Sequence, residues 1–253
     1  MKPLILITND DGVNARGLYV LIDIACKYGE VVVMAPEQNA SGKSHSITTT
    51  RPLRVEEVKR DNDITVYSCD GTPVDCVKLA FEYFCPRPPD LVLSGINHGS
   101  NSSINVLYSG TMGAVVEASA LGVKAIGFSL LNHNPMADFL DAIPYVSYIT
   151  EVILNNNLPT DISLNVNIPR SDRDKIKGVR ICHEAKAIWR DSYEKRVDPQ
   201  GRPYWWLTGK FVCQDESESS DEWALRNGYV SIVPVGWNNT HYHSMKELER
   251  LFV

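Results

Sequence analysis

The first half of the chain alternates short apolar runs with segments of helical periodicity. The run Leu4–Thr8 is almost entirely apolar, and Val31–Ala35 has the same character. Runs without polar alternation are typical of parallel strands that are buried on both faces. Between them, Gly17–Tyr28 repeats apolar residues at helical spacing and stops before a glycine. This alternation predicts an α/β fold with a mostly parallel sheet and helices on both faces.

The same pattern assigns elements along the rest of the chain. We expect further strands at Ile64–Ser68, Asp90–Ser94, Lys124–Leu130, Ser163–Ile168 and Tyr229–Pro234. We expect helices at Pro73–Phe84, Met112–Leu121, Ala137–Leu154 (interrupted at Pro144) and Ser244–Leu251. The sheet is therefore predicted to be assembled mainly before Pro169.

The pattern changes after Pro169. Residues 170–210 are rich in Lys and Arg and hold the aromatic residues Trp189, Tyr193, Tyr204, Trp205 and Trp206. A turn sequence, Arg196–Arg202, separates two strand-like runs, which predicts a long hairpin. Such aromatics either pack on the chain's own core or bind a partner, and we favour oligomerisation. The acidic stretch Gln214–Glu222 is predicted to be a solvated loop.

Length and charge limit the function classes. At roughly 150 residues per domain, 253 residues form one large domain or a domain with an appendage. The net charge of −6 provides no overall positive field for a polyanion, so we expect no stable nucleic-acid partner. No stretch reaches about 18 consecutive apolar residues, so we expect no membrane partner. A local site for a small anionic substrate remains compatible with this composition.

The cysteines and the N-terminus predict a cytoplasmic protein. The 6 cysteines include no CxxC pair, and we expect reduced, buried side chains rather than disulfides or zinc ligands. The apolar run at the N-terminus is too short for a signal peptide and ends in two acidic residues.

Two adjacent carboxylates, Asp10 and Asp11, follow the first predicted strand within Thr8–Gly12 (TNDDG). In open α/β sheets, ligands bind beyond the carboxyl ends of the strands. Adjacent carboxylates there repel each other and lose hydration, and a bound divalent cation relieves both costs. Taken alone, the motif fits a polar turn or a helix cap equally well.

Further polar loops are predicted at the same edge of the sheet. The second strand is followed by a loop with Ser41 and Lys43, which lacks the spacing of a Walker phosphate loop. The strand Asp90–Ser94 is followed by the carboxamides of Asn97 and Asn101. Together with the two Asp side chains, these loops supply carboxylate, hydroxyl and amide oxygens.

The segment Tyr108–Ala114, which is rich in small residues, leads into the predicted helix Met112–Leu121. Small residues expose the backbone N–H groups at the positive end of a helix, which favours an anion there. No His or Cys cluster competes with the oxygen ligands of the neighbouring loops. The combination therefore predicts Mg²⁺ or Mn²⁺ rather than zinc or copper.

Four segments resemble the SurE family of survival proteins, which are metal-dependent 5′/3′-nucleotidases: Ile7–Gly12, Ala35–Ser44, Ser94–Asn101 and Tyr108–Thr111. The similarity continues in the same order through Asp70–Val77 and Asp198–Tyr204, so it covers most of the chain.

The resemblance implies one divalent metal ion per subunit, Mg²⁺ or Mn²⁺. Its implied ligands are Asp10, Asp11, Ser41 and Asn97. The implied phosphate-binding residues are Asn101, Ser109, Gly110 and Thr111. The implied catalytic residues are Asp10, Asp11 and Asn101.

One position departs from the family pattern. Ser103 stands where the family run NxGxNxG ends in glycine. If that glycine has a positive φ, we expect Ser103 to be strained or its loop to differ slightly.

The resemblance also implies an architecture and a reaction. It divides the chain into a Rossmann-like catalytic domain at 1–169 and an oligomerisation hairpin with a C-terminal exchange segment at 170–253, forming a homodimer or tetramer. The implied reaction is hydrolysis of nucleoside 5′- and 3′-monophosphates to nucleoside and phosphate. The alternative is a metal-dependent nucleotide sensor without turnover.

Several roles stay open at this point. Either Asp10 or Asp11 could accept a proton from the attacking water. Lys43 either contacts phosphate or points to solvent, and His45 and His98 are either hydrogen-bonded loop residues or proton donors to the leaving group. An aspartyl-phosphate phosphatase fits poorly, because its two acids are usually separated by one residue. A receiver domain would need a further Asp after a later strand.

Overall fold

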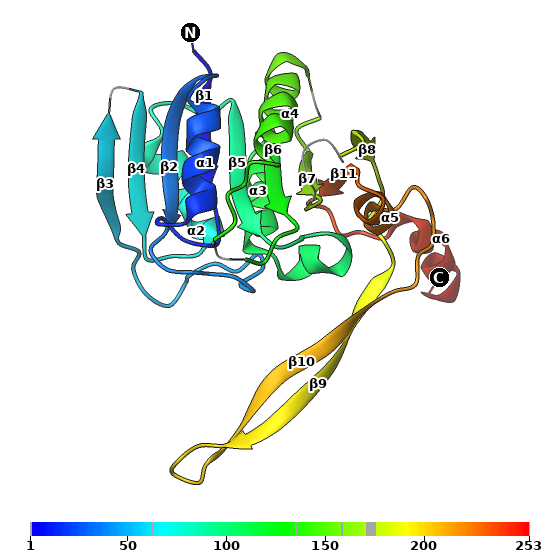
Figure 1. Cartoon of the computed structure of the whole chain (residues 1–253). Helices are drawn as coiled ribbons and strands as arrows, with labels where there is room; N and C mark the ends of the chain where they lie inside the picture. Colours follow the sequence, from blue (N-terminus) through cyan, green and yellow to red (C-terminus); the bar gives the residue numbers. More distant parts are fainter. Residues whose placement is uncertain (1, 62, 135, 158, 171–175, 253) are drawn as a thin grey trace.

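The computed structural model describes residues 2–61, 63–134, 136–157, 159–170 and 176–252, and it is built on a nine-stranded sheet (Figure 1). In spatial order the strands are β3 (Val55–Asp61), β4 (Ile64–Cys69), β2 (Glu30–Pro36), β1 (Leu4–Thr8), β5 (Leu91–His98), β6 (Ala125–Leu130), β7 (Ile162–Ile168), β11 (Val230–Gly236) and β8 (Val179–Ile181).

The centre of this sheet is parallel, as the apolar runs predict. Neighbouring pairs from β4 through β2, β1, β5 and β6 to β7 run parallel, whereas β3 and β11 pair antiparallel with β4 and β7. Every residue of β1 is buried, because helices cover both faces of the strand. The α/β prediction with a mostly parallel sheet is confirmed.

Four helices cover the two faces of the sheet: α1 (Arg16–Ala25), α2 (Pro73–Leu79, continued by a π-helical turn at Ala80–Phe84), α3 (Gly110–Ala120) and α4 (Ile143–Asn155). One core cluster holds Leu18 and Leu21 of α1 with Ile149 of α4. The other holds Val77 of α2 with Val115 of α3. Each fully buried side chain of this size stabilises the fold by about 1.5–3 kcal/mol, so these two clusters fix the helices to the strands.

The fold differs from the prediction in several places. The helix expected at Ala137–Leu154 begins only at Ile143, because Pro144 starts the helix rather than interrupting it. The edge strand β3 escaped prediction because its residues are charged and almost all exposed. The stretch Gln214–Glu222 is not wholly a solvated loop: Asp221 is fully buried and begins α5 (Asp221–Arg226).

Residues after 170 contribute to two regions. β8, β11 and α5 belong to the main body, and β11 pairs with β7 and β8 in the central sheet. The predicted hairpin is present as β9 (Ala187–Val197) and β10 (Pro203–Cys213), and it projects away from the body (Figure 1).

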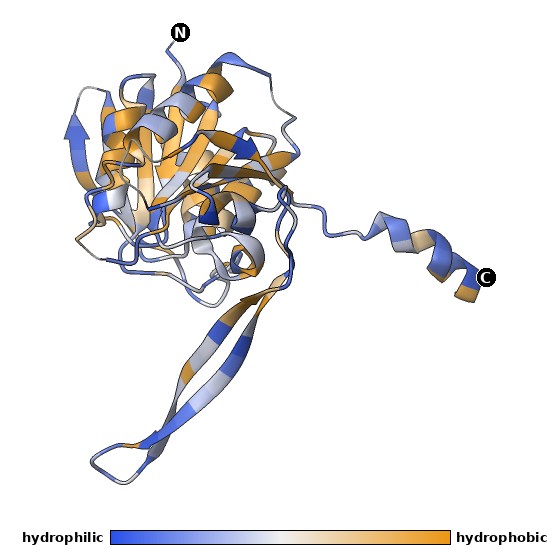
Figure 2. Cartoon of the chain, turned by 45° about the vertical axis from the view of Figure 1, so that its right-hand side comes forward, coloured by the Kyte–Doolittle hydropathy of each residue, from blue (hydrophilic) through white to orange (hydrophobic). Residues whose placement is uncertain are grey.

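The C-terminal helix α6 (Tyr242–Phe252) also stands away from the main body (Figure 2). None of its described residues is buried, although Leu248 and Phe252 are large apolar side chains. In the part of the chain that the structure describes, no helix combines the length and apolarity needed to cross a bilayer. All six cysteines are free thiols, as expected.

Candidate metal and phosphate site

The candidate site lies at the carboxyl ends of three neighbouring strands. β1 is the central one, with β2 on one side and β5 on the other. The chain leaves β1 towards β2 and later returns on the far side of β1 to form β5. The loops after these strands therefore diverge, and the space between them is where open α/β sheets bind ligands.

The loop after β1 is a tight turn closed by Asn9. The Asn9 side chain donates to the carbonyl of Gly12 at 3.0 Å and accepts the N–H of Gly12 at 3.2 Å. Gly12 has φ +103°, a conformation that residues with a Cβ rarely adopt. This turn fixes where Asp10 and Asp11 leave the strand.

Asp10 is buried and faces the N-terminus of α3. Its Oδ1 accepts the hydroxyl proton of Thr111 at 2.6 Å, and only 3% of the residue is exposed. Burial raises the pKa of Asp10, although hydrogen bonds from Thr111 and from the Gly110 backbone oppose the shift. Gly110 permits this approach, because a Cβ there would lie 2.8 Å from Cβ of Asp10.

Asp11 is partly buried beside Asp10. Burial and the neighbouring charge of Asp10 both raise the pKa of Asp11, and the backbone N–H of His98 donates to its Oδ2 at 3.4 Å. Both carboxylates are therefore held where their charged forms are disfavoured. A divalent cation between them would remove that cost.

The loop after β2 is fastened to Asp10 through the backbone. The N–H of Ala40 donates to the Asp10 carbonyl at 2.7 Å, and the Asn39 side chain accepts the N–H of Ser41 at 2.8 Å. Ser41 and Lys43 are exposed at this loop. Thus the predicted ligand Ser41 is carried on a segment joined to the predicted ligand Asp10.

Asn97 completes the predicted ligand set from β5. It is 8% exposed, and its Nδ2 donates to the Gly99 carbonyl at 2.9 Å, so its amide oxygen is the atom suited to ligation. The hydroxyl of Ser94 on the same strand and that of Thr8 on β1 are buried without a hydrogen-bond partner.

The donor chemistry of these loops fits a hard divalent cation. The ligands would be two carboxylates, a hydroxyl and a carboxamide, all through oxygen. Within the described residues, no group of three or more His, Cys, Asp and Glu could hold a metal ion instead. The buried Asp10 and the partly buried Asp11, side by side, form a pair that a divalent cation would fit.

The N-terminus of α3 supplies the predicted phosphate-binding residues. The Ser109 hydroxyl caps the helix by accepting the N–H of Met112 at 3.0 Å, which leaves its own proton free to donate. The hydroxyl of Thr111 donates its hydrogen to Asp10. The Thr111 side chain therefore positions Asp10, and the backbone N–H groups of Thr111 and Gly110 also face that carboxylate.

Asn101 is buried at the same edge, and three side chains hold it. Its Nδ2 donates to Ser129 Oγ on β6 at 2.8 Å. Its backbone N–H donates to Asn167 Oδ1, and its carbonyl accepts from Asn165 Nδ2, each at 2.8 Å. The polar alternation of Asn165 and Asn167 in an otherwise apolar strand was the sequence signal for this support, and sequence reasoning missed it.

The two histidines near the site differ in their contacts. His45 Nε2 lies 2.8 Å from Glu117 Oε2, and the other Glu117 oxygen pairs with Lys78, which favours a structural role for His45. His98 packs edge-on against Phe139, and its buried Nδ1 has no hydrogen-bond partner. The two rings are therefore held by different contacts, that of His45 by Glu117 and that of His98 by Phe139.

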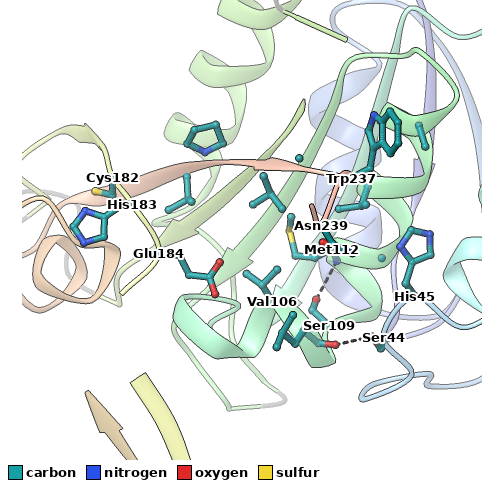
Figure 3. Close-up of a pocket in the computed structure, with 18 residues that line it drawn as sticks. Ser44, His45, Val106, Ser109, Met112, Cys182, His183, Glu184, Trp237 and Asn239 are labelled. Atoms are coloured by element: carbon teal, nitrogen blue, oxygen red, sulfur yellow. Dashed lines mark hydrogen bonds between the residues drawn. The ribbon is translucent and has the colours of Figure 1, made fainter. Parts of the chain in front are cut away.

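A cavity of about 760 Å³ adjoins the N-terminus of α3 (Figure 3). Ser109 and Met112 line it from α3, and Trp237 and Asn239 line it from the segment after β11. Its size falls within the roughly 300–1,000 Å³ typical of small-molecule sites. An organic group attached to a phosphate held at Ser109 would have room there.

Ser103 has the backbone conformation that the family glycine suggests. Its φ is +54°, so the expected strain is present. Its N–H donates to Asp221 Oδ2 at 2.8 Å, and its hydroxyl donates to the Ala185 carbonyl at 2.7 Å. The role of Asp221 escaped prediction because the acidic composition around it indicated solvent exposure.

Comparison with known proteins gives consistent matches along the chain. The 5′-nucleotidase SurE of Flavobacterium johnsoniae is 52% identical over 248 residues, covering 98% of this chain and 96% of the relative. The 5′-nucleotidase SurE of Phocaeicola vulgatus is 49% identical over 249 residues, with the same shares covered. These alignments extend through the hairpin and α6.

A solved structure and a family model agree with these relatives. The crystal structure of the SurE protein from Aquifex aeolicus superposes with a TM-score of 0.85 at 36% identity, covering 99% of this chain and 100% of that one. The family model described as survival protein SurE matches residues 5–191, which include the three strand ends and the start of α3. With its fold, its sheet-edge loops and its length all shared, the chain belongs to the SurE family.

Proposed function

We propose that this protein is a phosphoric monoester hydrolase that converts nucleoside 5′-monophosphates, and 3′-monophosphates, to nucleoside and phosphate. The observation that carries the proposal is the contact between a carboxylate pair and a helix N-terminus: Asp10 touches both Thr111 and Gly110 of α3. The names of the relatives, 5′-nucleotidase SurE, support the same reaction.

The reaction is proposed to need one divalent metal ion, Mg²⁺ or Mn²⁺, held by Asp10, Asp11, Ser41 and Asn97. Asp10 and Asp11 would repel an anionic phosphate unless a cation lay between the phosphate and the two carboxylates. When bound, the ion would neutralise charge on the phosphoryl oxygens and promote ionisation of water.

The chain's own groups would hold the phosphoryl oxygens. Asn101 would offer the amide hydrogen that Ser129 does not accept, and Ser109 would offer its hydroxyl proton. Gly110 and Thr111 would contribute at the N-terminus of α3, where their backbone N–H groups also face Asp10. Because the rigid start of α3 and the bonds to Asn165 and Asn167 fix these donors, little reorganisation would be needed during the reaction.

Asp11 is the better candidate for accepting the proton of the attacking water. Oδ1 of Asp10 is already occupied by Thr111, whereas the hydrogen bond from the His98 backbone to Asp11 is long, at 3.4 Å. The cavity beside Ser109 would accept the nucleoside.

We also propose a division of roles along the chain. Residues 1–169 would supply the groups that contact metal and phosphate, and within residues 170–253 the hairpin and the C-terminal segment would assemble subunits into a homodimer or tetramer, while β8, β11 and α5 complete the main body. The exposed large side chains of the hairpin and of α6 support this, among them Trp205, Trp206, Leu207 and Phe252. A cytoplasmic location stays a prediction of the sequence.

The decisive experiment measures phosphate release from a panel of nucleoside 5′- and 3′-monophosphates with Mg²⁺, Mn²⁺ or EDTA. We expect release with at least one of the metals and its loss in EDTA, restored when metal is added back. Release that is equal in EDTA would overturn the metal dependence. Metal-dependent nucleotide binding in calorimetry without any release would instead establish the alternative, a nucleotide sensor.

A further inference from the structure

A buried carboxylate that the proposed chemistry does not use lies behind the phosphate-binding loop. Asp221 is fully buried at the start of α5. Its Oδ2 accepts the N–H of Ser103 at 2.8 Å, and its Oδ1 accepts the N–H groups of Ala185 at 3.0 Å and Glu222 at 2.7 Å. One side chain thus joins three segments that are distant in the sequence.

The segment that Asp221 holds is in a conformation that needs support. Ser103 has φ +54°, which is unfavourable for a residue with a Cβ. The hydroxyl of Ser103 adds a bond to the Ala185 carbonyl, and the neighbouring Ser102 hydroxyl donates to Glu222 Oε1 at 2.5 Å. These contacts hold the left-handed turn against its tendency to relax.

The turn follows the candidate phosphate contact directly. Asn101 lies two residues before Ser103, and its backbone is pinned on the sheet side by Asn165 and Asn167. The loop is therefore clamped between β7 on one side and Asp221 on the other. Relaxation of Ser103 would pull on the backbone of Asn101, whose amide group must meet a phosphoryl oxygen.

We propose that Asp221 is a positioning residue, which fixes Asn101 by holding Ser103 in its left-handed conformation. The inference rests on the proposed function, in which Asn101 contacts phosphate. The same carboxylate holds Ala185, two residues before β9, so the loop and the base of the hairpin share one anchor. Trp189 Nε1 adds a second link by donating to Asn105 Oδ1 at 2.8 Å.

The informative variant is Asp221→Asn. An asparagine has one acceptor oxygen where Asp221 uses two, so its amide hydrogens must face either Ser103 or the Ala185 and Glu222 N–H groups. The side chain keeps its size, but it can no longer accept both the Ser103 N–H of the loop and the Ala185 N–H at the base of the hairpin. We expect kcat/KM for 5′-AMP with Mn²⁺ to fall by about 10- to 100-fold, as small displacements of a reacting group do.

Hydrogen exchange separates positioning from a general loss of stability. In Asp221→Asn we expect faster exchange in peptides covering 99–109, with exchange in β1 and β5 unchanged. The matched control is Asp90→Asn, which weakens a carboxylate bond to the Leu4 N–H at the opposite end of β1. That control should leave kcat/KM and the 99–109 peptides unchanged.

A second substitution tests the backbone conformation itself. Glycine adopts a positive φ without the cost that a Cβ imposes, so Ser103→Gly in the Asp221→Asn background should recover at least threefold of the lost kcat/KM. Ser103→Gly alone is the reference for this comparison. If the single Asp221 variant does not fold, the double variant is compared with Ser103→Gly by the same assays.

The results sort cleanly. Localised exchange, a fall in kcat/KM and partial recovery by glycine support the positioning role. An unchanged kcat/KM, or exchange that rises equally throughout the chain without recovery, overturns it. If the wild-type protein releases phosphate from no nucleotide, the proposed function fails by itself. Exchange in 99–109 then decides the positioning role: localised acceleration supports it, and unchanged or uniform exchange overturns it.

Discussion

The sheet edge and the hairpin arm (β9 and β10) differ in how far their side chains are buried and bonded within the chain. At the sheet edge, Asp10 is 3% exposed and bonded to Thr111, and the surrounding loops are tied to one another. On the arm, Trp206 is 57% exposed and Leu207 is 62% exposed. The edge bonds most of its polar groups within the chain, whereas the arm leaves large apolar side chains exposed.

Their charges differ in the same way. Acidic residues on the arm lie beside arginines in solvent, as Asp198 does with Arg202 at 2.8 Å. Such exposed pairs contribute little to stability, typically below about 1 kcal/mol. At the edge, burial and mutual repulsion raise the pKa of Asp11 beside Asp10. Among the described residues, the edge carboxylates therefore lack the cationic partners that the arm carboxylates have.

The largest effect is expected at the edge. Asp11→Asn removes a charge from the proposed metal site and should lower metal-dependent phosphate release on the order of 10²- to 10³-fold, comparable to removing a key electrostatic contact. Asp198→Asn in the hairpin turn is the control and should retain activity. Unchanged metal-dependent release in Asp11→Asn would show that the proposed ligand set is wrong.

The arm should fail differently. Replacing Arg190–Lys210 by an Asn-Gly turn leaves Trp189 opposite Phe211 but removes the exposed Tyr193, Tyr204, Trp205 and Trp206. We expect a smaller species in light scattering, with the α/β body still folded by circular dichroism. A mass per particle that falls only by the deleted residues would exclude the arm from the assembly interface.

A smaller effect is expected where α3 approaches Asp10. In Gly110→Ala the new Cβ would lie 2.8 Å from Asp10 Cβ and 3.2 Å from Pro73 Cγ. Overpacking of this kind costs about 1–3 kcal/mol in the free energy of unfolding, measured in urea, and it should also lower phosphate release. Gly236→Ala, whose Cβ would meet nothing closer than 4.0 Å, should leave the free energy of unfolding unchanged.

The smallest effect concerns acid stability at α2. Burial raises the pKa of Asp75, but hydrogen bonds from Thr48 and Thr72 outweigh it and hold the pKa below its ordinary value. A depressed folded pKa stabilises the protein above the unfolded pKa of about 3.9, and this stability is lost as pH falls through the folded pKa.

Asp75→Asn should therefore cost about 1 kcal/mol in the free energy of unfolding at pH 7, like the loss of a helix cap. The difference from the wild type should shrink as pH falls from about 4 through the depressed folded pKa, because the wild-type carboxyl becomes protonated over that range. Urea unfolding at both pH values checks this, with the exposed Glu249→Gln as control. A difference that is constant with pH would contradict the role of the charge.

Much of the fold could be predicted because buried elements are visible in the sequence, as continuous apolar runs in strands and as apolar residues at helical spacing in helices. Leu4–Thr8 is apolar since both faces of β1 are covered, and its predicted bounds match the structure. The apolar pattern is missing in β3, because that strand is exposed. At α4 the pattern is ambiguous, because a proline such as Pro144 can either interrupt a helix or begin one. Pairing across the sheet, rather than local preference, decides such segments.

The candidate site likewise has features that could be predicted from the sequence and features that could not. Asp10, Asp11 and the carboxamides could be predicted because strand ends converge by geometry. The bond from Thr111 to Asp10 could not, since it joins residues far apart in the sequence. The acidic stretch before α5 was misread because composition does not reveal that Asp221 meets three backbone N–H groups.

The sequence by itself determined the α/β alternation, the order of the polar loops and the hairpin, because periodicity and turn chemistry are local properties. Only the tertiary structure decided which groups support Asn101 and Ser103, and that the N-terminus of α3 rests on Asp10. Those contacts depend on the close approach of distant segments, where differences of a few tenths of an ångström determine whether a side chain fits or a hydrogen bond forms.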